Sequence, residues 1–297
     1  MGSEMCIRDR NKISFNDIVK GEMEFSTENL DDFIILKGST FPTYNFAVVI
    51  DDHLMEISHV IRGDDHISNT PRQLLLYDAL GWDSPRFAHI PMILGPDGTR
   101  LSKRHGATSV MQYKEEGYLA EALVNYLALL GWSTEDSQQI FTKEELIQKF
   151  SLQRCGKSAA VFDPQKLIWM NGEYIRRATP EGLTNTSMPF LEKAGIAING
   201  MTTSAIALEQ DKFKLLTDIP QRIDFMIRDE FNYDGKATEK VLAKEGVKEI
   251  LESIRAILSG VDESEFQERT LEEVVPVSYT HLRAHETSLH LVCRLLL

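Results

Sequence analysis

Apolar and polar residues alternate near the beginning of the chain, over residues 11–37. Ile13 and Phe15 precede Gly21, and Met23 and Phe25 follow it. A period of two is typical of a strand with one buried face, and a glycine between two such runs marks a turn. The pattern predicts a short β-hairpin that is the last part of a larger domain, whose earlier part we expect to be missing.

Short apolar runs replace this alternation over residues 44–94. Three of them, at 46–50, 59–61 and 87–94, are predicted strands, and a helical period closed by Gly81 lies between the last two. A strand, a helix and a second strand at this spacing predict a crossover between parallel strands of one sheet.

Beyond residue 94 a polar loop, GPDGTRLSKRHGATS, leads into a part of the chain that is almost entirely helical by period. Thr142 followed by Glu145 has the spacing of a capping box, and Asp163 before Pro164 is a cap followed by proline in the first helical turn. Helices are predicted at 109–116, 119–130, 142–150, 163–175, 180–194, 205–216 and 237–258. An all-helical second domain is expected to begin after Asn171.

The two ends, residues 1–10 and 277–297, share no pattern with their neighbours. They resemble translated sequencing-adapter tails and are interpreted as non-native. His281, His285 and His290 have the spacing of metal ligands, but the sequence offers no second ligand cluster, so no metal site is predicted.

Composition narrows the class of protein. The 297 residues contain no apolar run long enough to span a bilayer, and three widely separated cysteines fit neither a disulfide framework nor a zinc site. We therefore expect a cytoplasmic protein without a membrane segment. A net charge of -13 argues weakly against nucleic-acid binding, although local basic clusters could still form a positive stripe.

The polar loop contains the residues most suited to phosphate chemistry, RLSKR at 100–104. A lysine beside a hydroxyl and two arginines, following a parallel strand, suits charge stabilisation on a polyphosphate. A solvated basic turn is the alternative that these five residues alone leave open.

RLSKR resembles the second signature of class I aminoacyl-tRNA synthetases, usually KMSKS and often KLSKR in the glutamyl family. The resemblance runs from FPTYNFAVVIDD through HVIRGDDHISNTPRQ and FAHIPMILGPDGTRLSKRHGATS to VFDPQKLIWMNGEYIRR, and covers roughly residues 11–275. The family is that of bacterial-type glutamyl-tRNA synthetases. The resemblance implies an α/β fold followed by an all-α part: the second half of a Rossmann-like catalytic domain at 11–105, a helical stem-contact region at 106–175 and a helical anticodon-binding domain at 176–276.

The resemblance assigns the loop to ATP. It implies that Lys103 contacts the phosphates and stabilises the charge that develops as the glutamate carboxylate attacks the α-phosphorus, while Ser102 positions the loop and Mg2+ shares the charge. Arg100 departs from many relatives, which have lysine there. The expected ATP-binding set is completed by Leu101, Arg104 and His66, with the backbones of Ile93 and Leu94 at the adenine edge.

The resemblance assigns the amino-acid pocket to Arg62 in HVIRGDD, with Tyr44 and Val48. A buried glutamate carboxylate needs a fixed cation that can bind two oxygens, and relatives that charge glutamine lack this arginine. Asp64 and Asp65 are expected at the tRNA 3′ end. The alternative for Arg62 is an ordinary surface ion pair with one of these two aspartates, and for Tyr44 a half-buried core position.

The predicted function is ATP-dependent attachment of L-glutamate to tRNA(Glu) through a glutamyl-adenylate, by a monomer. We find no HIGH-type motif in the sequence, so this chain alone is expected to be inactive. Two alternatives stay open: a tRNA-modifying relative that attaches glutamate to a modified nucleoside, and a non-catalytic tRNA-binding fragment.

Overall fold

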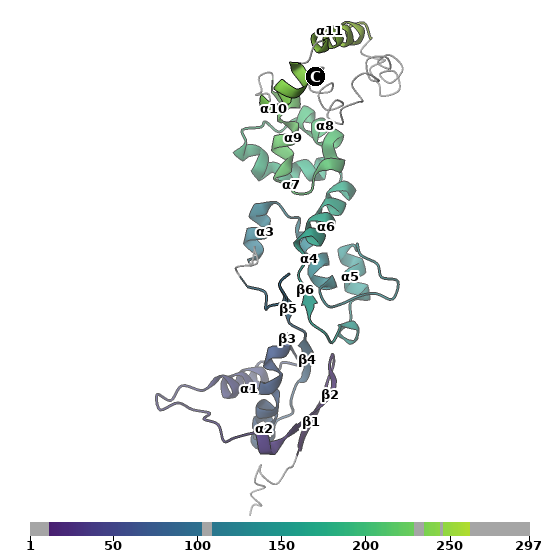
Figure 1. Cartoon of the computed structure of the whole chain (residues 1–297). Helices are drawn as coiled ribbons and strands as arrows, with labels where there is room; N and C mark the ends of the chain where they lie inside the picture. The colour runs from purple at the N-terminus through teal and green to yellow at the C-terminus, as the bar shows by residue number, and fades with distance from the viewer. Residues whose placement is uncertain (1–11, 103–108, 229–234, 244–245, 262–297) are drawn as a thin grey trace, which may run out of the picture. The chain divides into compact units, whose positions relative to one another are not determined.

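A computed structural model describes residues 12–102, 109–228, 235–243 and 246–261. The chain divides into two compact units, residues 1–174 and 175–297 (Figure 1). The first unit contains all the strands of the described residues, and the second is helical. Within the described residues, no helix is long and apolar enough to cross a membrane.

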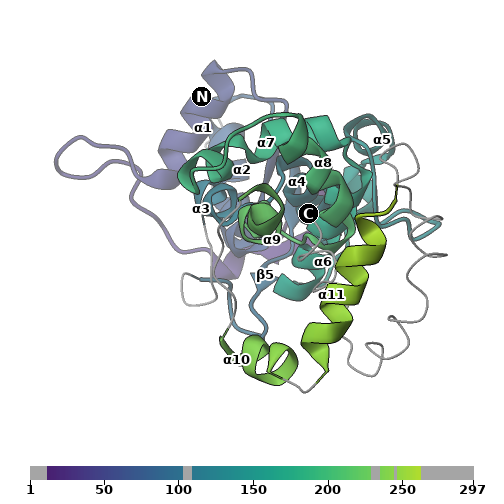
Figure 2. The ribbon, with the colours of Figure 1, turned by 90° about the horizontal axis from the view of Figure 1, so that it is seen from above.

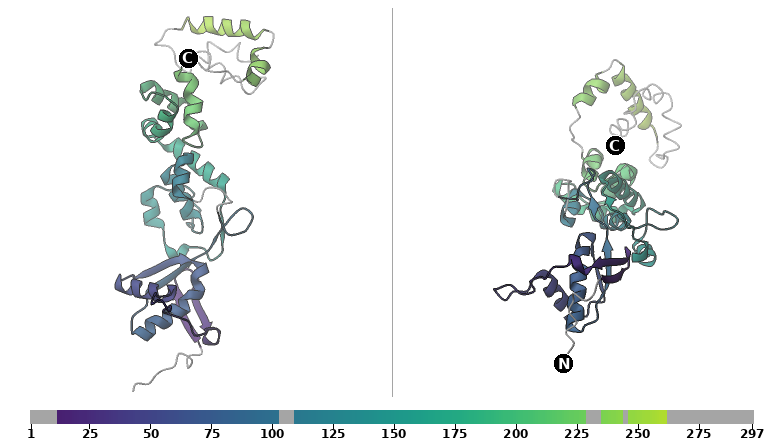
Figure 3. Two further views of the ribbon diagram at one scale, coloured as in Figure 1. Left: turned by 90° about the vertical axis from the view of Figure 1, so that its left-hand side faces the viewer. Right: turned by 60° about the horizontal axis from the view of Figure 1, so that its bottom comes forward.

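The predicted hairpin is confirmed. Strand β1 (Lys12–Asp17) pairs antiparallel with β2 (Gly21–Ser26), so that Ile13 faces Phe25 across the two strands. Gly21 has a φ of +88°, a left-handed conformation that suits glycine, and it closes the turn. The backbone N–H of Ile18 donates to the carbonyl of Phe87 at 2.9 Å, which docks the hairpin turn on the neighbouring sheet (Figure 3).

The crossover is confirmed as well, but the single strand expected at 87–94 is two strands, at residues 86–90 and 93–94, which belong to different sheets. Strands β3 (His59–Gly63) and β4 (Arg86–Ile90) are parallel, and α2 (Thr70–Leu80) connects them. Gly81 ends α2 with a φ of +70°. Phe87 and Ala88 of β4 are buried, as expected for a strand covered on both faces.

The prediction of a strand at residues 46–50 is wrong, because this run lies inside helix α1 (Tyr44–Leu54). Five apolar residues fit a buried turn of helix as well as a strand, and period alone does not separate the two. The α1 helix lies against α2: Val49 is fully buried and packs with Leu76 and Tyr77 of α2. Packing between the two helices therefore decides the conformation of this run.

The rest of the first unit is built around a second parallel pair, β5 (Ile93–Leu94) with β6 (Ala160–Val161). Three predicted helices lie between these strands in sequence and are confirmed: α3 (Val110–Glu116), α4 (Ala120–Leu129) and α5 (Lys143–Lys149). The capping box at Thr142 is present, with its hydroxyl accepting from the Glu145 amide and the Glu145 carboxylate accepting from the Thr142 amide. Helix α4 supplies Leu123 and Tyr126 to the core that it shares with Phe162, Leu167 and Met170.

Helix α6 (Pro164–Arg177) begins as predicted, because the Asp163 carboxylate accepts from the backbone N–H groups of Gln165 and Lys166 at 2.9 and 3.2 Å. In the second unit, α7 (Pro180–Lys193) is confirmed and packs with α8 (Gly200–Glu209) and α9 (Asp218–Ile227) (Figure 2).

Two helix predictions in the second unit are wrong in extent. The helix expected at 205–216 is α8, which starts earlier because the Asn199 side chain caps the Thr202 amide. The α8 helix ends before residue 216. In the turn that leads to α9, the Asp218 carboxylate accepts from the backbone amides of Lys214 and Leu215. The helix expected at 237–258 is instead α10 (Gly235–Ala237), a π turn (Thr238–Leu242) and α11 (Val247–Leu258), which follows Gly246 at φ +82°.

Candidate functional site

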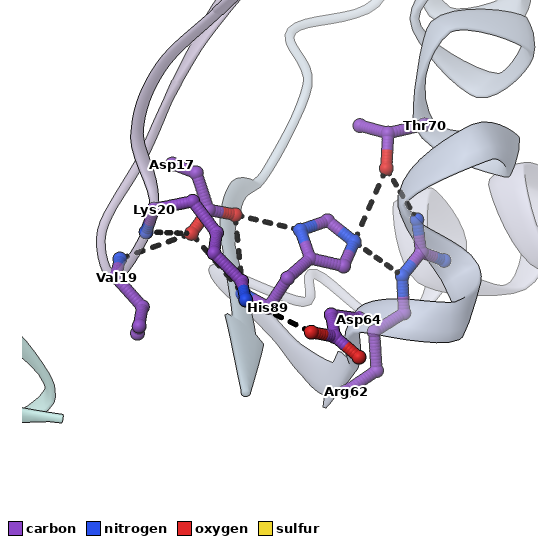
Figure 4. Close-up of polar contacts among 7 residues, drawn as sticks. All are labelled: Asp17, Val19, Lys20, Arg62, Asp64, Thr70 and His89. Atoms are coloured by element: carbon purple, nitrogen blue, oxygen red, sulfur yellow. Dashed lines mark hydrogen bonds and ion pairs between the residues drawn. The ribbon is translucent and has the colours of Figure 1, made fainter. Parts of the chain in front are cut away.

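Arg62 lies near the carboxyl end of β3 and is anchored along one edge of its guanidinium (Figure 4). Its Nε donates to Nε2 of His89 at 3.0 Å, and its Nη2 donates to the Thr70 hydroxyl at 2.8 Å. The guanidinium also lies over the Phe87 ring, 5.5 Å from the centroid. The Nε–H and one Nη2–H occupy one edge of this planar group, so the fork of Nη1 and the second Nη2–H points away from the anchor.

A carboxylate and an imidazole are buried directly behind this arginine. Asp17 Oδ2 lies 2.6 Å from His89 Nδ1, and neither side chain is exposed. The Asp17 carboxylate also accepts from the backbone N–H groups of Val19 at 3.0 Å, Lys20 at 2.8 Å and His89 at 3.1 Å. Burial by itself would raise the pKa of Asp17, but these hydrogen bonds outweigh it, so the pKa of Asp17 is lowered and the carboxylate is ionised.

Burial also lowers the pKa of His89, against the opposing effect of Asp17, so the neutral ring is favoured in the folded protein. A group whose pKa is lower in the folded state contributes stability above its ordinary value, and this is lost as the pH falls. For His89 the loss begins below about pH 6.5, and for Asp17 below about pH 3.9. Both shifts therefore make the protein less stable in acid.

We expect the free energy of unfolding to decline as the pH is lowered from 6.5 to 4.5, and the decline to be shallower in His89→Gln, which cannot titrate there. Urea unfolding at each pH measures it. A replacement at the surface, His59→Gln, is the control for the loss of an exposed histidine ring. Equal slopes for the parent and His89→Gln would show that His89 does not titrate as inferred.

Tyr44 interacts with both Arg62 and His66. The Tyr44 hydroxyl is 3.4 Å from His66 Nδ1. Burial lowers the pKa of Arg62, and the interaction with Tyr44 opposes this shift. Tyr44 is 52% exposed, so the alternative of a half-buried core position is wrong. Val48 lies on the same helix and is half-buried in the packing between α1 and α2. Two of the three residues predicted for the glutamate pocket, Tyr44 and Arg62, are thus brought together with His66.

The alternative ion pair for Arg62 is also wrong. Asp64 pairs with Lys20 at 2.8 Å, and Asp65 pairs with Arg100 at 3.1 Å. Both aspartates lie in the short 3-10 helix that follows β3, so they sit beside the arginine without neutralising it. No group of three or more side chains able to hold a metal ion occurs among the residues that the structure describes.

The basic loop leaves β5 through a tight turn. The Gly95 amide donates to the Thr99 carbonyl at 2.7 Å, and the Leu101 amide donates to the Ile93 carbonyl at 3.0 Å. Arg100 and Leu101 therefore run back beside β5, with Leu101 packed on the core and Ser102 exposed. Lys103 and Arg104 lie outside the described residues.

The backbone of β5 is largely occupied by the fold itself. The Ile93 carbonyl accepts from Leu101, and the Leu94 carbonyl accepts from the Phe162 amide at 2.8 Å. Each carbonyl has a second lone pair, so contact with an adenine edge remains a prediction.

Sequence reasoning did not find the two residues that bond to Arg62, Thr70 and His89, nor Asp17 behind His89. One signal was present: His89 interrupts the apolar run FAHIPMIL, and a polar residue in a buried strand requires a partner. The identity of that partner, Asp17, has no signature in a single sequence.

The family model for the catalytic domain of class I tRNA synthetases (E and Q) matches residues 2–169, and a model for an anticodon binding domain matches residues 168–278. The chain belongs to the class I tRNA synthetases (E and Q). Two of the relatives that it matches are each named glutamate–tRNA ligase. The chain is 49% identical to that of Elusimicrobium minutum over 88% of its own length and 54% of the relative, and 50% identical to that of Geotalea uraniireducens over 78% and 50%.

Solved structures agree with these sequence comparisons. The chain superposes on a glutamate tRNA ligase from Elizabethkingia meningosepticum, crystallised in complex with its amino acid, with a TM-score of 0.78 and 31% identity. The match covers 92% of this chain and 57% of that one. The chain thus spans about half the length of the curated relatives it matches.

Proposed function

We propose that this chain takes part in the ATP-dependent attachment of L-glutamate to tRNA(Glu) through a glutamyl-adenylate. The observation that carries the proposal is the anchored fork of Arg62. Its inner edge is bound to His89 and Thr70, so its outer edge is fixed in direction and suits a carboxylate with two parallel oxygens. Tyr44 interacts with the same guanidinium and is proposed to line the site of the acidic side chain.

Glutamate is favoured over glutamine by the chemistry of this fork. A guanidinium that is partly desolvated and not neutralised by Asp64 or Asp65 gains most from an anionic ligand. A glutamine amide would place an NH2 donor against one of the two N–H donors and leave the charge unpaired. The pocket therefore selects by charge and by hydrogen-bond direction together.

ATP and Mg2+ are proposed for residues 100–104. In activation, an oxygen of the glutamate α-carboxylate forms a bond to the α-phosphorus of ATP while the bond to pyrophosphate breaks. The basic loop runs beside β5 in the part that is described, and Arg100, at 71% exposure of its side chain, can reach a phosphate if it leaves Asp65. Mg2+ commonly enters such sites with the substrate phosphates.

The helical second unit is proposed to bind the anticodon, over residues 176–276. In the first unit, residues 106–175 are proposed to contact the tRNA stem, and Asp64 and Asp65 are proposed to lie near the tRNA 3′ end. The match to an anticodon binding domain supports the role of the second unit. It disfavours the tRNA-modifying alternative, which lacks such a domain. A cytoplasmic monomer is proposed as the working state.

A chimera tests the proposal. In it, the 264-residue matching segment of this chain replaces its counterpart in the Elusimicrobium minutum ligase. We expect glutamate-dependent exchange of pyrophosphate into ATP and charging of tRNA(Glu), with much weaker exchange on glutamine. Efficient exchange on glutamine would contradict the assigned substrate, and tRNA binding without any exchange would favour the non-catalytic alternative.

A further inference from the structure

Two titratable side chains are buried behind Arg62, and one of them, His89, bonds to the arginine directly. Asp17, the last residue of β1, and His89, in β4, are joined at 2.6 Å and lie fully inside the protein. Together with Thr70 they form a continuous chain of hydrogen bonds that ends on Arg62 (Figure 4). Such a chain fixes the direction of each hydrogen bond as well as the position of each side chain, because every contact needs one donor and one acceptor.

The direction of every hydrogen bond in this chain follows from the arginine. A guanidinium has only donors, so Nε2 of His89, which receives the Nε–H of Arg62, must be an acceptor. The ring proton is then on Nδ1, where it donates to the Asp17 carboxylate. The Thr70 hydroxyl accepts from Arg62 and, at 3.2 Å from Nε2, can direct its own proton to the same ring nitrogen.

We propose that Asp17 and His89 are positioning residues for recognition of the amino-acid side chain: Asp17 holds His89 in its Nδ1–H tautomer, and His89 thereby holds the fork of Arg62 toward the ligand. The inference rests on the proposed function for the identity of the ligand, glutamate, but the tautomer and the arginine geometry stand on their own. Neither residue touches the ligand.

The hairpin turn is itself held in place, which makes Asp17 a suitable fixed point. Lys20, three residues further on, pairs with Asp64 at 2.8 Å and donates to the Lys157 carbonyl at 2.9 Å. Lys157 in turn donates from its side chain to the Lys20 carbonyl at 3.0 Å. The turn is therefore fastened both to the segment after β3 and to the segment before β6.

The variant Asp17→Asn changes the direction of a hydrogen bond and leaves the side-chain packing almost unchanged. Asparagine keeps one oxygen, which can go on accepting from the Val19 and Lys20 amides, and replaces Oδ2 by an NH2 donor. Nδ1 of His89 must then accept, so the ring proton moves to Nε2 and faces the Nε–H of Arg62. Two donors in contact cannot bond, and the arginine loses its anchor with almost no change in side-chain volume.

The experiment uses the 297-residue chain with 15N-labelled histidine and arginine. Long-range 1H–15N spectra report the tautomer of His89, and the Nε–H signal of Arg62 reports its anchoring, with assignments from variants at each position. L-glutamate is then titrated. We expect an Nδ1–H tautomer and a protected Arg62 Nε–H in the parent, and an Nε2–H tautomer, an exchange-broadened Arg62 signal and roughly tenfold or more weaker glutamate binding in Asp17→Asn.

His89→Gln is the conservative rescue, because its amide can donate to Asp17 and accept from Arg62; it should retain the Arg62 signal and most of the affinity. Asp163→Asn, the same change at the cap of α6, controls for stability and should alter none of these readouts. An Nε2–H tautomer in the parent, or an Arg62 signal and glutamate affinity unchanged in Asp17→Asn, would overturn the inference. If the parent binds no glutamate, the proposed function is weakened, but the tautomer of His89 and the Arg62 signal still decide the positioning role. If Asp17→Asn does not fold, His89→Gln and His89→Leu provide the comparison instead.

Discussion

Replacing Arg62 by glutamine is expected to raise the glutamate concentration for half-maximal pyrophosphate exchange by roughly 100-fold or more in the chimeric ligase. The change leaves the carboxylate of a bound glutamate without its cation, and breaking a buried charge pair in this way costs about 3 to 5 kcal/mol. Discrimination against glutamine should fall at the same time, because the glutamine amide no longer meets a row of donors.

Two further variants make the Arg62 result specific. Arg62→Lys keeps the charge and loses the fork, so it should recover only part of the affinity. Arg72→Gln removes an arginine on α2 that donates to the Ser68 carbonyl and should leave the kinetics for glutamate unchanged. Parental kinetics in Arg62→Gln would place the amino-acid pocket elsewhere.

Lys103→Ala is expected to slow glutamyl-adenylate formation by two to three orders of magnitude and to leave tRNA binding unchanged. A lysine aimed at phosphate charge acts mainly in the transition state, and one such donor is worth about 2.7 to 4 kcal/mol. Because Lys103 lies outside the described residues, this prediction rests on the resemblance of RLSKR to the family signature.

Single-turnover rates with glutamate and ATP in the chimera measure the effect, and filter binding measures tRNA affinity. Lys143→Ala, at an exposed position in the first turn of α5, is the matched control and should behave as the parent. An unchanged rate for Lys103→Ala would contradict a role in phosphate binding and favour the alternative, in which residues 100–104 are a solvated basic turn.

The features that the sequence predicts well are local. The hairpin, the crossover through α2 and the capped start of α5 each depend on residues within a few positions of one another, whose periodicity or capping pattern is visible in one sequence. Arg62 could be singled out because it ends a short apolar run in HVIRGDD, a motif that resembles the family's.

The features that the sequence does not predict depend on tertiary contact. Residues 46–50 are helical because α1 packs on α2, and nothing within five apolar residues records that contact. Asp17 and His89 are a pair only because the hairpin docks on β4, so their shared role cannot be read from either segment alone. Sequence reasoning therefore located the ligand-facing side of the site and missed the support behind it.

The long separation of Asp17 and His89 links recognition to folding. The two residues are 72 positions apart, whereas His89 and Arg62 are 27 apart. Contacts of such long range form late, after local helices and turns, because the entropy of loop closure must be overcome first. During synthesis of the chain the hairpin can therefore form well before His89 leaves the ribosome. Arg62 has no fixed orientation until His89 contacts Asp17. Under the inference above, Arg62 is therefore held toward its ligand only after the hairpin has docked on β4.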